Sequence, residues 1–99
     1  MNTQETNTGK DSRIERMTAL LEVLKPQSIE IIDDSHLHAG HAGARDGGGH
    51  YRMNIVSAQF AGQTTVARHR MIYSELADMM KHDIHALNIS ARVPEEDLV

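Results

Sequence analysis

The sequence predicts an α+β fold, a two-layer sandwich in which helices cover one face of a three-stranded mixed sheet. Two segments have apolar residues at helical spacing, and three others are rich in β-branched residues, which gives the order α-β-β-α-β. A chain of 99 residues forms one small domain. The first two strands are expected to pair antiparallel. The helix between the second and third strands favours a right-handed parallel crossover.

The first helix is expected to begin at Ser12 and to end before Pro26. Ser12 and Glu15 have the spacing of a capping box, in which each side chain binds a backbone amide at the helix start. Residues 1–11 are polar and lack the apolar run of a secretory signal, and we expect them to be a disordered lead-in. The helix carries one apolar stripe: Ile14, Met17, Leu21 and Leu24.

Two strands are expected on either side of a glycine-rich loop. The first covers residues 28–32 and the second covers residues 51–57, with residues 35–50 between them. Apolar and polar residues alternate in the second strand. Its core-facing residues are expected to be Tyr51, Met53 and Ile55.

A long second helix and a third strand complete the pattern. Thr64 or Thr65 is expected to cap the helix, which runs to about Lys81. The third strand is expected over residues 84–91, and residues 95–99 form a short acidic tail. The helix has an expected buried stripe of His69, Ile72, Tyr73, Leu76, Met79 and Met80. One face of the strand is expected to carry His85, Leu87 and Ile89.

The composition excludes several classes of function. With no cysteine, the chain cannot form a disulfide, use a catalytic thiol or supply a thiolate ligand to a metal. A net charge of −4 argues against non-specific nucleic-acid binding, and no apolar run approaches the length of a membrane span. The motifs of common hydrolases and nucleotide-binding enzymes are absent. We therefore expect a cytoplasmic protein that is not an enzyme and is a monomer or weak homodimer.

Histidines suggest a metal-binding role, because imidazole is the commonest neutral nitrogen ligand. The predicted topology brings the start of the third strand to the same end of the sheet as the loop, so His85 and His82 are expected near it. His69 is instead expected to be a structural histidine in the helix. A flexible loop favours a half-site completed by another molecule, although such loop histidines are more often unliganded. The loop contains His36, His38, His41 and His50.

Several short motifs follow one another along the chain: Asp33-Asp34-Ser35 followed by His38, His50-Tyr51-Arg52, Phe60-x-Gly62, Arg68-His69-Arg70 and Ile84-His85-Ala86-Leu87. Together these motifs resemble the BolA family over about residues 12–94. The resemblance implies a fold related to the class II K-homology domain and one BolA-like domain over 12–94.

This resemblance implies a partner of a monothiol glutaredoxin in iron–sulfur cluster assembly, trafficking or iron regulation. In such pairs the glutaredoxin and its glutathione supply thiolates to a bridging [2Fe–2S] cluster. The BolA-like partner supplies its third-strand histidine and one loop residue, which here match His85 and His38, with His41 and His36 as alternative loop ligands. Imidazole can replace thiolate on one iron. The isolated chain is expected to hold no cluster.

The family also contains DNA-binding transcriptional regulators, which gives an alternative function. The matching surface is the Phe60–Gly62 turn and the following helix, with Gly62, Arg68 and Arg70 as contacts. The chain lacks the Gly-x-x-Gly loop by which K-homology domains clamp a nucleic-acid backbone. On the plainer interpretation, the two arginines pair on the helix surface with Glu75 or Asp78.

Overall fold

A computed structural model describes residues 10–38 and 48–97 of the chain. One sheet has the strand order β1-β2-β3, in which β1 pairs antiparallel with β2 and β2 pairs parallel with β3. The strands are β1 (Ser28–Asp33), β2 (Gly49–Val56) and β3 (Ile84–Arg92). The predicted fold class and strand pairing are confirmed.

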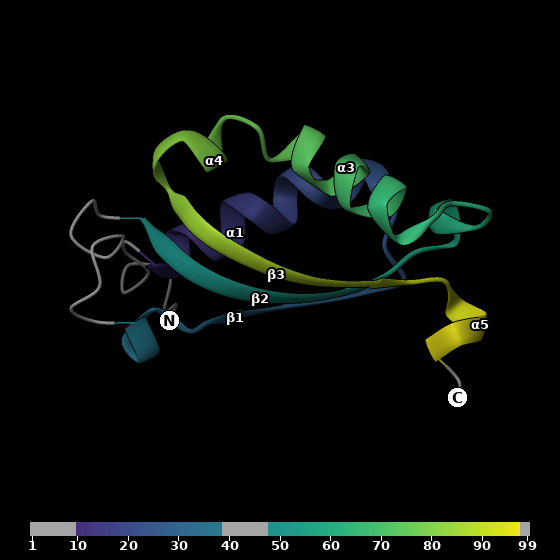
Figure 1. Cartoon of the computed structure of the whole chain (residues 1–99), viewed down its shortest axis with the longest axis horizontal. Helices are drawn as coiled ribbons and strands as arrows, with labels where there is room; N and C mark the ends of the chain where they lie inside the picture. Colours follow the sequence, from purple (N-terminus) through teal and green to yellow (C-terminus); the bar gives the residue numbers. More distant parts are fainter. Residues whose placement is uncertain (1–9, 39–47, 98–99) are drawn as a thin grey trace, which may run out of the picture.

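The principal helices lie together on one face of the sheet (Figure 1). They are α1 (Lys10–Leu20), α3 (Thr65–Glu75) and α4 (Met79–His82). Shorter helical segments are η2 (Leu21–Leu24), η3 (Ser35–His38), η4 (Ala58–Phe60) and α5 (Pro94–Asp97). None of the helices in the described part of the chain has the length and hydrophobicity to cross a membrane.

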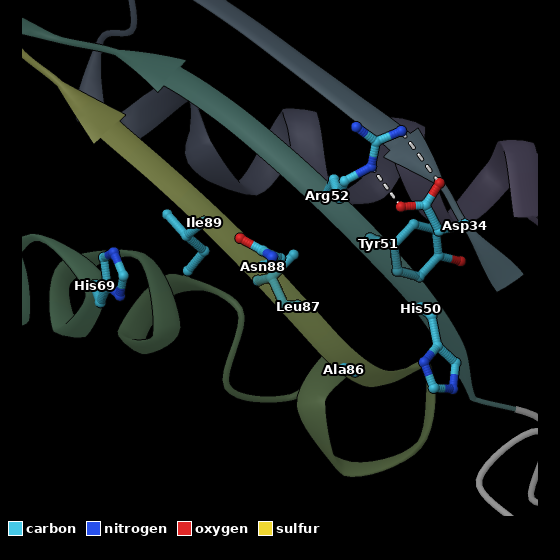
Figure 2. Close-up of a pocket in the computed structure, with 9 residues that line it drawn as sticks. All are labelled: Asp34, His50, Tyr51, Arg52, His69, Ala86, Leu87, Asn88 and Ile89. Atoms are coloured by element: carbon cyan, nitrogen blue, oxygen red, sulfur yellow. Dashed lines mark hydrogen bonds and ion pairs between the residues drawn. The ribbon is translucent and has the colours of Figure 1, made fainter. Parts of the chain in front are cut away.

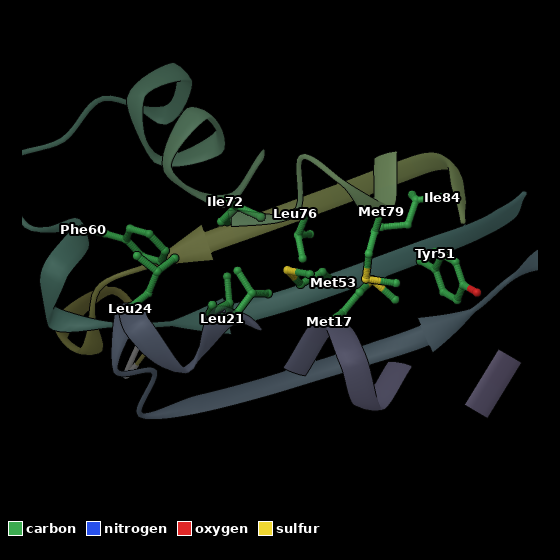
Figure 3. Close-up of a cluster of buried hydrophobic side chains, with 11 residues drawn as sticks. Met17, Leu21, Leu24, Tyr51, Met53, Phe60, Ile72, Leu76, Met79 and Ile84 are labelled. Atoms are coloured by element: carbon green, nitrogen blue, oxygen red, sulfur yellow. The ribbon is translucent and has the colours of Figure 1, made fainter. Parts of the chain in front are cut away.

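The core fills the space between these helices and the sheet (Figure 3). It contains a single phenylalanine and is otherwise built largely from aliphatic and methionine side chains, as the composition predicts. The predicted core-facing residues of β2 are all buried. The core cluster is Met17, Leu21, Leu24, Tyr51, Met53, Ile55, Phe60, Ile72, Leu76, Met79 and Ile84.

The first helix differs from the prediction at its start. Helical backbone begins at Lys10, so Ser12 lies inside the helix and the predicted capping box is wrong. The helix end before Pro26 is confirmed. Its last turn tightens into η2, after which Lys25 adopts a left-handed conformation with φ of 50° and donates its amide to the carbonyl of Glu22 at 2.9 Å.

The second helix is capped as expected but is not continuous. The Thr64 hydroxyl accepts a hydrogen bond from the amide of Ala67 at 3.1 Å, which confirms Thr64 as the N-cap. A turn over residues 76–78 then separates α3 from α4, so the single helix to Lys81 is wrong. Tyr73 is also exposed rather than buried, because its ring leans towards the edge of β3.

The third strand contains an irregularity that the alternation rule does not capture. A register shift beside Gly49 and His50 pairs Gly49 with Ile84 and His50 with Ala86. Ile84 therefore enters the core, whereas His85 is exposed and does not continue the face of Leu87 and Ile89. The predicted common face of these three residues is wrong at His85.

Arg68 fastens the end of the domain to α3. Its side chain is 13% exposed and donates hydrogen bonds to the carbonyl of Ala91 and to Glu96, each at 2.9 Å. Arg92 and Asp97 form a second ion pair at 3.0 Å. The first residues of the predicted acidic tail are therefore part of α5 and are held against the domain.

Replacing Ser57 with alanine is expected to destabilise the fold. Ser57 is fully buried, and its hydroxyl donates to the carbonyl of Leu24 at 2.6 Å and accepts from the amide of Gln59 at 3.1 Å. Ser57→Ala removes both bonds and should lower the free energy of unfolding by about 1–3 kcal/mol. Urea unfolding followed by circular dichroism measures the loss. Ser74→Ala, at an exposed site in α3, is the control and should change little.

Replacing Arg68 with alanine is expected to loosen the end of the domain. The Arg68 guanidinium, with a smaller contribution from the Val93 amide, holds the pKa of Glu96 below its usual range. Arg68→Ala should raise that pKa, as measured by NMR titration of the Glu96 carboxyl group. Because the pKa is lowered in the folded state, the ion pair stabilises the fold above about pH 4. Its contribution disappears as the pH falls through the lowered pKa.

Arg70→Ala is the matched control, since Arg70 is exposed on the same helix. An unchanged Glu96 titration in Arg68→Ala would contradict the role given to Arg68.

Candidate functional site

Three chain segments meet at the end of the sheet where β1 ends and where β2 and β3 begin (Figure 1). Backbone hydrogen bonds join them. The amide of Asp34 donates to the carbonyl of His50 at 2.7 Å, and the amide of Gly49 donates to the carbonyl of Asp83 at 3.0 Å. The His50 amide donates to the Ser35 hydroxyl at 3.0 Å. The amide and the carbonyl of His50 are thus both bound by the segment that follows β1.

This junction places two imidazole rings beside each other. The ring centroids of His50 and His85 lie 5.0 Å apart, with their planes at 46°. His50 is buried with 8% exposure, whereas His85 is exposed. His85 was expected near the loop, and its position beside His50, the last residue of that predicted loop, agrees with this expectation.

Glycines allow the segments to come this close. A Cβ atom added to Gly48 would lie 3.0 Å from the Cβ of His85 and 3.1 Å from its amide nitrogen. A Cβ at Gly49 would lie 2.6 Å from the ring of Tyr51, which is inside any normal contact distance. These two glycines therefore have a packing role.

The other candidate histidines are spread around this junction. His82 is the exposed last residue of α4 and borders a hollow of about 330 Å³ that His85 and Gly48 also line. His36 is exposed in η3. His38 also belongs to η3, but its side chain lies outside the described part of the structure. His41 lies outside the described residues.

A larger hollow of about 500 Å³ runs along β3 (Figure 2). His50 lies at one end and the half-buried His69 of α3 lies at the other, so His69 does not join the histidine pair. The ion pair of Asp34 and Arg52 borders the same hollow, and Asp34 raises the pKa of Arg52 by accepting its hydrogen bonds. Its lining residues are Asp34, His50, Tyr51, Arg52, His69, Ala86, Leu87, Asn88 and Ile89.

Sequence reasoning missed the importance of His50. It was assigned to the loop, yet β2 already begins at Gly49, which places His50 in the ladder opposite Ala86. The signal was available in the predicted topology, because a residue at the start of the second strand lies beside the start of a parallel third strand.

The chemical capacity of the site is that of an incomplete ligand set. Across residues 10–38 and 48–97, no three His, Asp or Glu side chains lie close enough together to hold a metal ion. The adjacent imidazoles of His50 and His85 carry nitrogen atoms of the kind that bind metal ions, and the ring of His85 is accessible from outside. Such a pair is suited to a centre whose remaining ligands come from another molecule.

Among the residues of the alternative DNA surface, Arg68 has different surroundings from those expected. Gly62 is exposed and has φ of +77°, which explains the glycine in this turn. Arg68 pairs with Glu96 rather than with Glu75 or Asp78, so its predicted pairing is wrong. Arg70 is exposed. A DNA-binding function stays a prediction that these contacts do not favour.

The sequence is similar to a family model and to several known proteins. A family model described as "BolA-like protein" matches residues 20–96. SufE-like protein 1, chloroplastic/mitochondrial, of Arabidopsis thaliana is 45% identical over 78 residues, which cover 74% of this chain and 21% of that protein. BolA-like protein 1 of Homo sapiens is 35% identical over 79 residues, which cover 80% of this chain and 56% of that protein. The chain therefore spans only part of these two relatives.

The fold of this chain is also similar to a solved structure. The BolA domain of SufE1 from Arabidopsis thaliana has a TM-score of 0.75 and 42% sequence identity, covering 86% of this chain and 95% of that domain. The cytoplasmic location and the likeness to K-homology domains stay predictions. From the family match and the shared fold, the chain belongs to the BolA-like family.

Proposed function

We propose that this chain is a partner of a monothiol glutaredoxin and supplies histidine ligands to a bridging [2Fe–2S] cluster. The proposed role lies in cluster assembly, cluster trafficking or iron regulation. The observation that carries the proposal is the exposed imidazole of His85, which lies at a structurally fixed strand start in a chain without cysteine.

The donor set fits a shared cluster better than a resident one. Iron–sulfur clusters are normally held by thiolates, but imidazole can replace thiolate on one iron. This chain has only nitrogen and oxygen donors, so the thiolates have to come from the glutaredoxin and its glutathione. When bound, the cluster would supply electron-transfer or iron-sensing chemistry, and this chain would supply imidazole ligands.

His85 is the best-supported ligand of this chain. Its main chain lies between Ile84 and Ala86, which are both paired with β2, and against Gly48, while its ring remains exposed. The second ligand is proposed to be His38, with His41 and His36 as alternatives from the same loop. His50 is a further candidate because its ring already lies beside that of His85.

Loss of His85 is expected to abolish the effect of this chain on the cluster. Mixing the wild-type chain with a cluster-loaded monothiol glutaredoxin should change the visible absorption and circular dichroism of the cluster. His85→Ala removes the imidazole that is proposed to bind iron, so the changed spectrum should be lost, while binding of the apo proteins persists. His82→Ala is the control, because His82 is an exposed histidine on the same hollow.

A further series of variants distinguishes the contributions of the loop histidines. His38→Ala should weaken the cluster signature, and addition of His41→Ala should weaken it further. A spectrum that His85→Ala leaves untouched would refute the ligand role. The absence of both a spectral change and a binding isotherm with wild-type protein would refute the glutaredoxin partnership.

Replacing Gly48 with alanine is expected to impair the site without removing a ligand. The added Cβ would crowd the main chain and Cβ of His85, so His85 has to move by a few tenths of an ångström. The cluster signature of Gly48→Ala should therefore weaken on titration with loaded glutaredoxin. Gly62→Ala is a suitable control, because it strains a remote turn at φ of +77° by about 1 kcal/mol without touching His85. Equal spectra for the two variants would contradict the expected displacement.

A further inference from the structure

Every second residue of β3 directs its backbone amide and carbonyl away from β2, towards the outer edge of the sheet. β3 lies at the edge of the sheet. The carbonyl of Arg92 accepts the amide of Ser57, so it points inward to the β2 side. Because backbone groups alternate in direction along a strand, the peptide groups of Leu87, Ile89 and Ala91 point outward.

Two side chains of α3 donate hydrogen bonds to outward-pointing carbonyls, one near each end of this edge. Arg68 donates to the carbonyl of Ala91 at 2.9 Å, and Tyr73 donates its hydroxyl to the carbonyl of Leu87 at 3.4 Å. Arg68 is further restrained by the carbonyl of Gln63, at 2.9 Å from its Nε. The edge is therefore covered at two points by one helix.

The strand itself carries little that would prevent pairing with another strand. Exposed edge strands in soluble proteins are commonly protected by proline, or by lysine and other charged residues, within the strand. Between His85 and Arg92, β3 contains only Ala, Leu, Asn, Ile and Ser, none of which is charged. Protection of this edge therefore falls on α3.

We propose that the outer edge of β3 is a latent self-pairing surface for a second copy of this chain, which Arg68 and Tyr73 keep closed. An antiparallel pair about a twofold axis at Ile89 would place Leu87 of one copy opposite Ala91 of the other. Both outer hydrogen-bonded pairs would then need the carbonyls that the two α3 side chains occupy. Only the central Ile89 pair would form without displacing them.

A second copy is the partner that this edge fits best. The strand is uncharged over residues 87–91, the five residues that would pair about Ile89. The twofold arrangement also places a large side chain, Leu87, beside a small one, Ala91, which avoids crowding on the helix-facing side. The resulting sheet would run continuously from one copy into the other.

The test is the double variant Arg68→Met, Tyr73→Phe, which removes both donors and keeps most of the apolar volume. Analytical ultracentrifugation should give a dimer dissociation constant at least about tenfold lower than that of the wild type. Amide hydrogen exchange by NMR should slow at Leu87, Ile89 and Ala91 as the protein concentration rises. Arg70→Met is the matched control and should behave as the wild type does.

A folded double variant that sediments like the wild type would overturn the proposal, as would a dimer whose β3 amides gain no protection. If the double variant does not fold, Tyr73→Phe alone decides, because it removes only an exposed hydroxyl and uncovers the carbonyl of Leu87. Slower exchange with rising concentration at the amide of Ala91, which would donate to the freed carbonyl of Leu87 in the other copy, then supports the proposal. Exchange that does not depend on concentration overturns it.

Discussion

The parallel pairing of β2 with β3 is the constraint on which the rest of the structure depends. A parallel connection needs a crossover, which α3 and α4 provide, and it brings the starts of both strands to one end of the sheet. The register shift beside Gly49 and His50 then directs Ile84 into the core and leaves His85 exposed. The apolar packing and the accessible imidazole are therefore consequences of the same strand pairing.

Hydrophobic periodicity was sufficient to predict the sheet but not its local departures from regularity. The alternating residues of β2 and the cap at Thr64 follow from local chemistry, and both were predicted correctly. The turn that separates α3 from α4 has no proline or glycine to signal it. The side chain of Tyr73 binds the carbonyl of Leu87 in β3. The spacing of apolar residues within a helix cannot predict a contact with a strand.

The same distinction applies to the candidate site. His85 was predictable because topology alone brings the third strand to the loop. The neighbouring His50 was missed because the start of β2 was placed two residues too late, and strand ends are the least certain part of a sequence pattern. The pairing of Arg68 with Glu96 joins residues from α3 and α5, so no helical spacing rule predicts it.

These contacts change how the Arg68-His69-Arg70 motif is understood. A paired arginine motif on a helix first suggests phosphate binding, but Arg68 uses its donors on two backbone carbonyls and a carboxylate of its own chain. A loss of DNA affinity in an Arg68 variant would therefore not identify a DNA contact, since the domain end would be altered as well. Only the exposed Arg70 can separate the two explanations, because its substitution leaves that network in place.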